Sequence, residues 1–250
     1  MDKAQLKIAA LGALGGAALS VIIVFASAAL GAFPLNGEQV KRYLMANPTI
    51  LVEMMAKVQD QQAADADRVQ NEIVAKLGPK ALFDPKVAYV TGPANAKNTL
   101  VEFFDYNCVH CRNSLAAMKK YYAEHKGDTR FAFVDFPIFG EMSDEAARTA
   151  IAARKQGDKY VAFSFLLMGE KGAITSTDQI LADAKAAGLD IPKLIADMKD
   201  PETDKTMAAA HLLAKQLKID GTPSFVGNGR FHAGELTYEE LRDFMAGKDL

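Results

Sequence analysis

Two cysteines separated by two residues follow directly on an apolar stretch of the chain. Thr99 to Phe104 reads as a buried strand, Cys108-Val109-His110-Cys111 comes next, and a helical pattern covers Leu115 to Tyr122. A thiolate at a helix N-terminus meets unsatisfied backbone N–H groups and the positive end of the helix dipole, which lower its pKa. Two intervening residues let both sulfurs meet within one helical turn and form a reversible disulfide. This unit predicts an α/β fold that carries a redox-active dithiol.

The cysteine count narrows the chemistry further. The 250 residues include only these two cysteines, which cannot build a disulfide scaffold or a four-cysteine zinc site, and the remaining histidines have no paired ligand spacing. A structural disulfide across two residues would restrict little unfolded-state entropy. We therefore predict redox catalysis without a cofactor, with Cys108 as the exposed nucleophile and Cys111 as the resolving thiol one turn further in. His110 lies between them and can add positive charge or hydrogen bonding beside the thiolate.

Strand and helix signals continue on both sides of the dithiol. The sequence predicts strands at Val87–Val90 and at Arg130–Phe136, each followed by turn residues. Residues 141–217 show several helical stretches and no clear strand, so we expect a helical insertion there. Gly227-Asn228-Gly229 between two short apolar runs predicts a hairpin, and a closing helix begins at Thr237 with a capping box.

The N-terminal segment is an export signal or a membrane anchor. No charged residue occurs between Lys7 and Glu38, and residues 8–33 are almost wholly apolar or small. Ala26-Ser27-Ala28 offers a small-x-small cleavage site, yet the run exceeds a typical signal core and reaches the roughly 20 residues that a spanning helix needs. Both alternatives stay open for residues 1–33, and both place the remainder outside the cytoplasm.

Residues 34–79 predict a helical stalk. A short helix from Gly37 to Ala46 precedes Asn47-Pro48, a helix start signal, and Gly78-Pro79 is expected to stop the second helix. After Pro48, Leu51, Met54, Met55 and Val58 lie on one stripe. The stalk can pack on its own domain or assemble several copies of the chain, and its position before a complete domain favours assembly through residues 36–77. The heptad pattern alone is too broken to establish a coiled coil.

The dithiol and a distant proline motif carry a resemblance to a known family. Two segments resemble the DsbA-like branch of the thioredoxin superfamily: Val101-Glu102-Phe103-Phe104-Asp105-Tyr106-Asn107-Cys108-Val109-His110-Cys111 and Gly221-Thr222-Pro223-Ser224-Phe225. The resemblance covers about residues 83–247, and we expect the corresponding domain at residues 80–250. With its N-terminal helices the chain is most similar to exported thiol oxidoreductases related to the suppressor-of-copper-sensitivity proteins. The resemblance implies a thioredoxin-like α/β fold with an inserted helical domain, periplasmic localisation, and oligomers such as trimers.

The resemblance also assigns roles by position. Cys108 matches the nucleophile, Cys111 the resolving cysteine, and Pro223 the cis-proline beside the dithiol. Thr222 is expected to present backbone groups to an extended substrate. Glu102 stands where the family places a buried acid near the resolving thiol, and burial would raise its pKa and suit it to proton transfer. The alternative for Glu102 is an exposed strand residue, because its neighbours do not settle which face it occupies.

Three functional alternatives remain open from the sequence. The first is thiol–disulfide exchange with exported proteins, as an oxidase or an isomerase, in contact with a membrane redox partner. The dipeptide Val109-His110 and the residue Thr222 give conflicting indications of whether the protein is an oxidase or an isomerase. The second is a copper-binding protein that uses both thiolates, because soft thiolates select Cu(I). The third is a membrane-anchored reductant for cytochrome maturation. With 29 Lys+Arg against 31 Asp+Glu, the chain has no global charge that favours nucleic acid.

Overall fold

The computed structural model describes residues 37–248, so the predicted export or anchor segment at 1–33 lies outside the described residues. Contacts divide the chain into two compact units, residues 1–62 and residues 63–250. Among the helices of residues 37–248, none is both long and apolar enough to cross a membrane.

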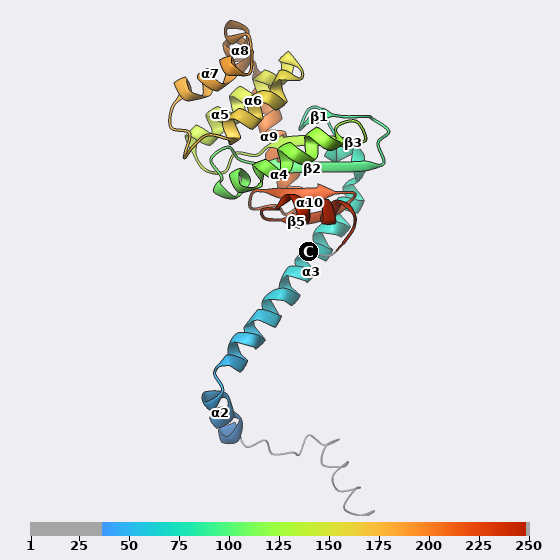
Figure 1. Cartoon of the computed structure of the whole chain (residues 1–250), viewed down its shortest axis with the longest axis vertical. Coiled ribbons are helices and arrows are strands. Elements are labelled where there is room, and N and C mark those ends of the chain that lie inside the picture. Colours follow the sequence, from blue (N-terminus) through green and yellow to red (C-terminus); the bar gives the residue numbers. More distant parts are fainter. Residues whose placement is uncertain (1–36, 249–250) are drawn as a thin grey trace, which may run out of the picture. The chain divides into compact units, whose positions relative to one another are not determined.

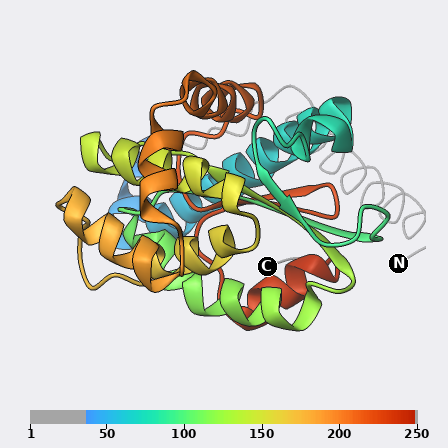
Figure 2. The same ribbon diagram turned by 90° about the horizontal axis from the view of Figure 1, so that it is seen from above.

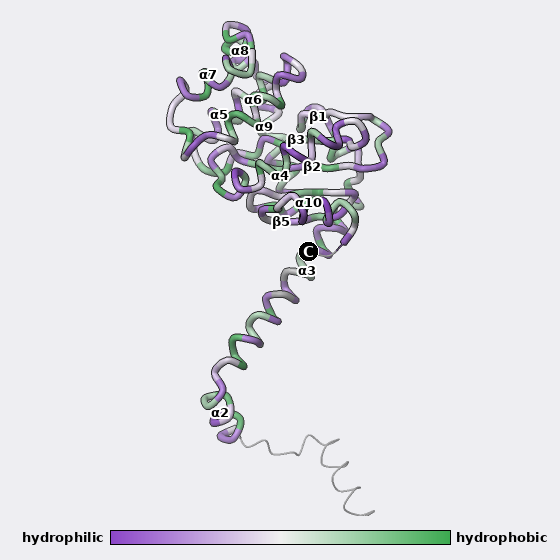
Figure 3. The backbone as a smooth tube through the Cα atoms, viewed as in Figure 1, coloured by the Kyte–Doolittle hydropathy of each residue, from purple (hydrophilic) through white to green (hydrophobic). Residues whose placement is uncertain are grey.

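The described part of the first unit is helical and carries an unburied apolar stripe. It contains α2 (Gly37–Ala46) and the beginning of α3 (Thr49–Leu82), and α2 buries none of its side chains. On α3 the apolar side chains recur at intervals of three and four residues, which places them on one face of the helix. Figure 3 shows the resulting hydrophobic patches along this part of α3. The exposed members are Leu51, Met54, Met55 and Val58.

The second half of α3 belongs to the dithiol unit. Val74 and Leu82 are 2% and 4% exposed, and both join a hydrophobic cluster on one face of the sheet. The expected end of the helix at residues 78–79 is a break rather than a stop. Gly78 takes a left-handed φ of 67°, which favours glycine. Pro79 then begins a new turn, where its missing N–H is not needed, and its carbonyl accepts a hydrogen bond from Phe83 N.

A five-stranded mixed sheet forms the centre of the second unit (Figure 1). The strand order is β1-β3-β2-β4-β5, in which β2 and β3 are parallel and every other neighbouring pair is antiparallel. The first strand begins two residues later than predicted, because residues 84–88 form turns. The strands are β1 (Tyr89–Thr91), β2 (Asn98–Phe104), β3 (Thr129–Asp135), β4 (Ser224–Gly227) and β5 (Arg230–Ala233).

Helices bury both faces of the sheet, which explains why β2 is almost continuously apolar. On one face lie α4 (Val109–His125) and α10 (Tyr238–Met245), side by side in Figure 2, together with the helices between β3 and β4 other than the last one. The other face packs on the end of α3 and on α9 (Pro201–Gln216). The dithiol therefore stands at the end of a strand that is buried on both sides.

The chain between β3 and β4 is helical, and we call it the helical insertion. Apart from α9, which packs on the other face of the sheet, its core is continuous with that of the sheet face that carries α4. It consists of α5 (Glu141–Ala153), η1 (Arg154–Gln156), α6 (Lys159–Met168), α7 (Thr177–Ala186), α8 (Ile191–Met198) and α9. The predicted hairpin and closing helix are confirmed: Asn228 and Gly229 both have positive φ, as a type I′ turn requires, and Thr237 and Glu240 form the capping box of α10.

Candidate active site

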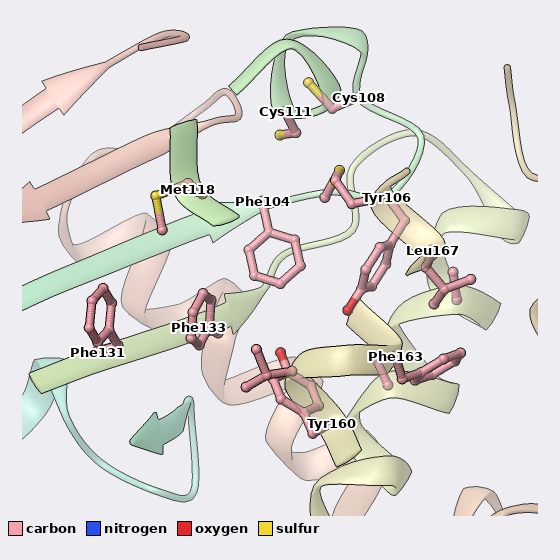
Figure 4. Packing of buried hydrophobic residues seen from close by; sticks show 14 of the residues in the cluster. Phe104, Tyr106, Cys108, Cys111, Met118, Phe131, Phe133, Tyr160, Phe163 and Leu167 are labelled. Carbon is pink, nitrogen blue, oxygen red and sulfur yellow. The ribbon is translucent and has the colours of Figure 1, made fainter. Parts of the chain in front are cut away.

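The two cysteines lie at the start of α4, at the end of β2. Cys108 is the N-cap of α4, with extended backbone angles, and Cys111 lies in its first turn. Both are free thiols, and Figure 4 shows their sulfurs above the aromatic side chains that pack beneath α4. Three residues separate the end of the buried strand from the helix cap, so the predicted order of strand, dithiol and helix is confirmed.

Cys108 is a stabilised thiolate, although it is less accessible than the sequence suggested. The prediction that it is exposed is wrong: its exposed fraction is 1%, since its Sγ lies 3.1 Å from the carbonyl oxygen of Thr222. Hydrogen bonding from the Cys111 thiol is the largest cause that lowers the pKa of Cys108, to about 5, and the backbones of Cys111 and His110 add to it. The helix N-terminus thus supplies the donors that the sequence predicted.

Cys111 has the opposite character. Its exposed fraction is also 1%, and burial, followed by its hydrogen bond to Cys108, raises its pKa far above that of a free thiol. One sulfur of the pair is therefore ionised near neutral pH and the other is protonated. This asymmetry lets Cys108 attack or leave as a thiolate while Cys111 holds a proton.

The proline motif meets the dithiol across 114 residues of sequence. The Thr222–Pro223 peptide bond is cis, as the resemblance implies, and Thr222 O lies 3.1 Å from Cys108 Sγ. The carbonyl of Pro223 accepts from Gly234 N at 2.9 Å, which ties this loop to the end of β5. The structure thus brings Thr222 and Pro223 to the nucleophile.

His110 is exposed and pairs with a residue that sequence reasoning missed. Its Nδ1 lies 3.2 Å from Glu235 Oε2, and Asn113 Nδ2 donates to the same oxygen at 2.7 Å. These bonds, that of Asn113 first, hold the pKa of Glu235 below its usual value. Glu235 lies 125 positions from His110 in the sequence, so no local spacing could have indicated this contact.

Glu102 is buried, which excludes the exposed alternative. It is 7% exposed on the same face of β2 as Leu100 and Phe104, and burial alone raises its pKa from 4.5 to about 8. A cavity of about 10 Å³, near the volume of one water, is lined by Glu102 and Ser164 among others. In the described residues Glu102 has no hydrogen bond or ion pair, so its link to Cys111 stays a prediction.

Comparisons with known families match both parts of the chain. The sequence profile of the family described as thioredoxin matches residues 86–246, and that of the copper resistance protein ScsC N-terminal domain matches residues 37–65. The chain also matches sodium/proton antiporters called NhaA; that of Herminiimonas arsenicoxydans is 26% identical over 147 residues, 59% of this chain and 23% of the antiporter. The chain thus spans about a quarter of the length of the curated relatives it matches.

Solved structures of thiol oxidoreductases share the fold of the second unit. A thioredoxin-like oxidoreductase from Silicibacter pomeroyi DSS-3 is 39% identical, with a TM-score of 0.62, over 68% of this chain and 96% of that one. The thiol–disulfide exchange protein α-DsbA2 from Wolbachia pipientis is 26% identical, with a TM-score of 0.66, over 72% and 96%. A periplasmic thioredoxin-like protein from Salmonella enterica serovar Typhimurium is 25% identical, with a TM-score of 0.60, over 67% and 93%. The chain therefore belongs to the thioredoxin family, and its dithiol unit is a thiol–disulfide oxidoreductase domain of the DsbA-like, ScsC-related type.

Proposed function

We propose that this chain exchanges dithiols and disulfides with exported proteins, as an oxidase or an isomerase, with Cys108 as nucleophile and Cys111 as resolving thiol. The observation that carries the proposal is the opposite ionisation of two adjacent thiols: the pKa of Cys108 is lowered to about 5, while that of Cys111 is raised. A stabilised Cys108 thiolate is a good leaving group, and it favours the reduced form of the dithiol. The dithiol is therefore a ready acceptor of electrons from substrate thiols.

Oxidation of a substrate proceeds in two balanced steps. A substrate thiolate attacks Cys108 Sγ of the Cys108–Cys111 disulfide, a mixed disulfide forms, and Cys111 leaves and takes up a proton. A second substrate thiolate then attacks the substrate sulfur of the mixed disulfide and releases the Cys108 thiolate. Two electrons pass from the substrate to the dithiol. In isomerisation the reduced Cys108 attacks a substrate disulfide, and the same mixed disulfide rearranges without net electron transfer.

Thr222 and Pro223 are proposed to bind the substrate backbone. They lie beside Cys108, and extended substrates can pair with a free backbone edge by strand addition. His110 is proposed to act beside the thiolate, on the exposed side of the first turn of α4. Glu102 is proposed to exchange a proton with Cys111 during the resolving step, because its raised pKa lies near neutral.

Two cysteine variants test the mechanism. We expect Cys108→Ala to abolish insulin reduction and the reactivation of scrambled ribonuclease, because no other thiolate is available. Cys111→Ala removes one thiol as well, yet keeps the nucleophile, so it is expected to accumulate mixed disulfides with substrate that dithiothreitol releases. Activity retained by Cys108→Ala would refute the mechanism. If the protein refolds reduced ribonuclease faster than scrambled ribonuclease, its main activity is that of an oxidase. If it refolds scrambled ribonuclease faster, its main activity is that of an isomerase.

The stalk is proposed to join several copies of the chain. The stripe of Leu51, Met54, Met55 and Val58 is 50–59% exposed, and burial of such side chains against a second copy would remove apolar surface from water. We expect Met55→Glu to lower the mass measured by light scattering, whereas the control Ala56→Glu, on the opposite face of the helix, leaves it unchanged. An unchanged mass for Met55→Glu would refute assembly through this face.

Residues 1–33 are proposed to direct the rest of the chain to the periplasm, where a membrane redox partner would reset the dithiol. The support is the uncharged apolar run of residues 8–33 and the similarity to a protein described as periplasmic. Fractionation with N-terminal sequencing tests this. A mature chain that begins after Ala28 would show cleavage, an intact N-terminus in the membrane fraction would show anchoring, and a cytoplasmic product would refute export.

Copper binding is a second candidate function, favoured by the match of residues 37–65 to a copper resistance family. Two adjacent thiols that can lose protons are suitable Cu(I) ligands. Within residues 37–248, no three His, Cys, Asp or Glu side chains are arranged to hold a metal ion. Anaerobic Cu(I) titration beside the ribonuclease assay separates the two candidates: a carrier binds Cu(I) tightly and fails to exchange disulfides.

A further inference from the structure

The three residues immediately before the nucleophile are each tied by their side chain to a different segment of the chain beyond β2. We call Asp105, Tyr106 and Asn107 the redox loop, because they connect β2 to Cys108. Asp105 and Tyr106 are each 1% exposed. The side chains of the redox loop contact the helical insertion and the end of β3. Within the described structure, neither the insertion nor the end of β3 forms a hydrogen bond with the sulfur of Cys108 or Cys111.

Asp105 holds the segment that opens α5. Its Oδ2 accepts hydrogen bonds from Ile138 N at 2.6 Å and from Phe139 N at 3.1 Å. Its Oδ1 accepts from Ser143 Oγ at 2.8 Å and, within the redox loop, from Asn107 N at 2.6 Å. Four donors on one buried carboxylate fix its position, because charge-assisted hydrogen bonds are about twice as strong as neutral ones.

Tyr106 reaches from the redox loop to α6. Figure 4 shows its ring extending toward the helix that carries Tyr160, Phe163 and Leu167. Its hydroxyl donates to Asp135 Oδ1 at 2.7 Å and is hydrogen-bonded with Ser164 Oγ at 3.1 Å. Asp135 is itself held by Arg154 at 2.5 Å, so this attachment ends in a buried ion pair.

Asn107 pairs with the connection between α6 and α7. Its Oδ1 accepts from Ile174 N at 2.7 Å, and its Nδ2 donates to Ile174 O at 3.4 Å, so the amide contacts both backbone groups of one buried residue. Arg112, from the first turns of α4, donates to Asn107 Oδ1 at 3.2 Å and to Tyr106 O at 2.8 Å. The redox loop is therefore fixed from the insertion side and from the helix side.

We propose that the helical insertion holds the redox loop in a fixed position. Ser143 and Ser164, which belong to the insertion, are then positioning residues that set the reactivity of Cys108 without touching it. The donors that stabilise the thiolate are the Cys111 thiol first, then Thr222 and the backbone of the first turn of α4, and hydrogen bonds weaken steeply when their geometry relaxes. A loop that loses an attachment lets Cys108 leave its position at the helix cap. This inference rests on the proposed exchange at Cys108.

Two hydroxyl deletions on the same helix form the test. Ser143 and Thr149 are both fully buried on α5, but Thr149 Oγ1 donates to Glu145 O within its own helix, whereas Ser143 reaches the redox loop. We expect Ser143→Ala to raise the midpoint of the thiolate titration, followed at 240 nm, by about half a pH unit, roughly threefold in the ionisation constant. The equilibrium with glutathione should shift by a similar factor toward the disulfide.

Thr149→Val is the matched control, which we expect to lower the unfolding temperature while both redox readouts keep their wild-type values. Ser164→Ala, at the second attachment, should shift both readouts in the direction of Ser143→Ala. This positioning role is refuted if Ser143→Ala and Ser164→Ala leave both readouts unchanged, or if Thr149→Val shifts both readouts as much as Ser143→Ala does. A wild-type titration near pH 5 that persists in Cys108→Ala would instead refute the proposed function itself.

Discussion

Glu102 makes the stability of the reduced protein depend on pH, and Glu102→Gln isolates that dependence. The carboxyl is 7% exposed, without a hydrogen bond or ion pair in the described structure, and burial raises its pKa from 4.5 to about 8. In the unfolded chain the same group ionises near its usual value. Between these two values the folded state binds a proton that the unfolded state has released.

The sign and the size of the effect follow from linkage. Because the folded pKa is the higher one, the favourable contribution is complete below about pH 4.5 and is lost as the pH rises to about 8. Each pH unit in this window lowers the free energy of unfolding by about 1.4 kcal/mol, so the full loss is about 5 kcal/mol. Glutamine has nearly the same shape and does not ionise, so the variant avoids this loss.

Urea unfolding of the reduced proteins measures this difference. We expect wild type and Glu102→Gln to differ little at pH 5, and the variant to gain stability steadily until it is several kcal/mol more stable at pH 8.5. Glu239→Gln, which removes an exposed carboxylate from α10, serves as the control and should follow the wild type. A pH-independent difference between wild type and Glu102→Gln would refute the assignment of a raised pKa to Glu102.

Three further substitutions test the fold by urea or thermal unfolding. Arg154→Met leaves the fully buried Asp135 without its cation and should cost about 3–5 kcal/mol, whereas adding Asp135→Asn should recover part of the loss. Gly92→Ala should cost about 3 kcal/mol or more, because Gly92 has a φ of 86° and an added Cβ would overlap the carbonyl of Thr129. Thr237→Ala removes the cap of α10 and should cost about 1 kcal/mol. Wild-type stability in any of these variants would contradict the corresponding contact.

Local sequence signals predicted the elements that position the dithiol. The apolar run of β2, the cysteine spacing and the hairpin at Asn228-Gly229 each depend on neighbouring residues, and each is found where it was expected. Gly227 belongs to β4 rather than to the turn itself. It is paired with Arg230, and a Cβ there would meet Phe244 at 2.5 Å, so close packing rather than turn geometry explains this glycine.

The remaining features of the site depend on contacts between residues far apart in the sequence, which local sequence patterns do not reveal. The face occupied by Glu102 was open because β2 is buried on both sides, so apolar neighbours give no alternation to follow. Cys108 is covered by Thr222, 114 residues away, and Glu235 approaches His110 across 125 residues. The anchors of the redox loop are also far from it in sequence: Asn107, for example, meets Ile174 across 67 residues.

The buried, unpaired carboxyl of Glu102 lowers the stability of the folded protein above about pH 5, so its presence at this position calls for a functional explanation. If Glu102 exchanges a proton with Cys111, its raised pKa is the property that the resolving step uses, because the acid can both give and take a proton near neutral pH. Glu102→Gln should then be the more stable protein and the slower catalyst: we expect unchanged formation of the mixed disulfide by Cys108 and slower release by Cys111 in rapid-quench assays. If the variant were more stable and resolved the mixed disulfide at the wild-type rate, the burial of Glu102 would serve no step of the exchange.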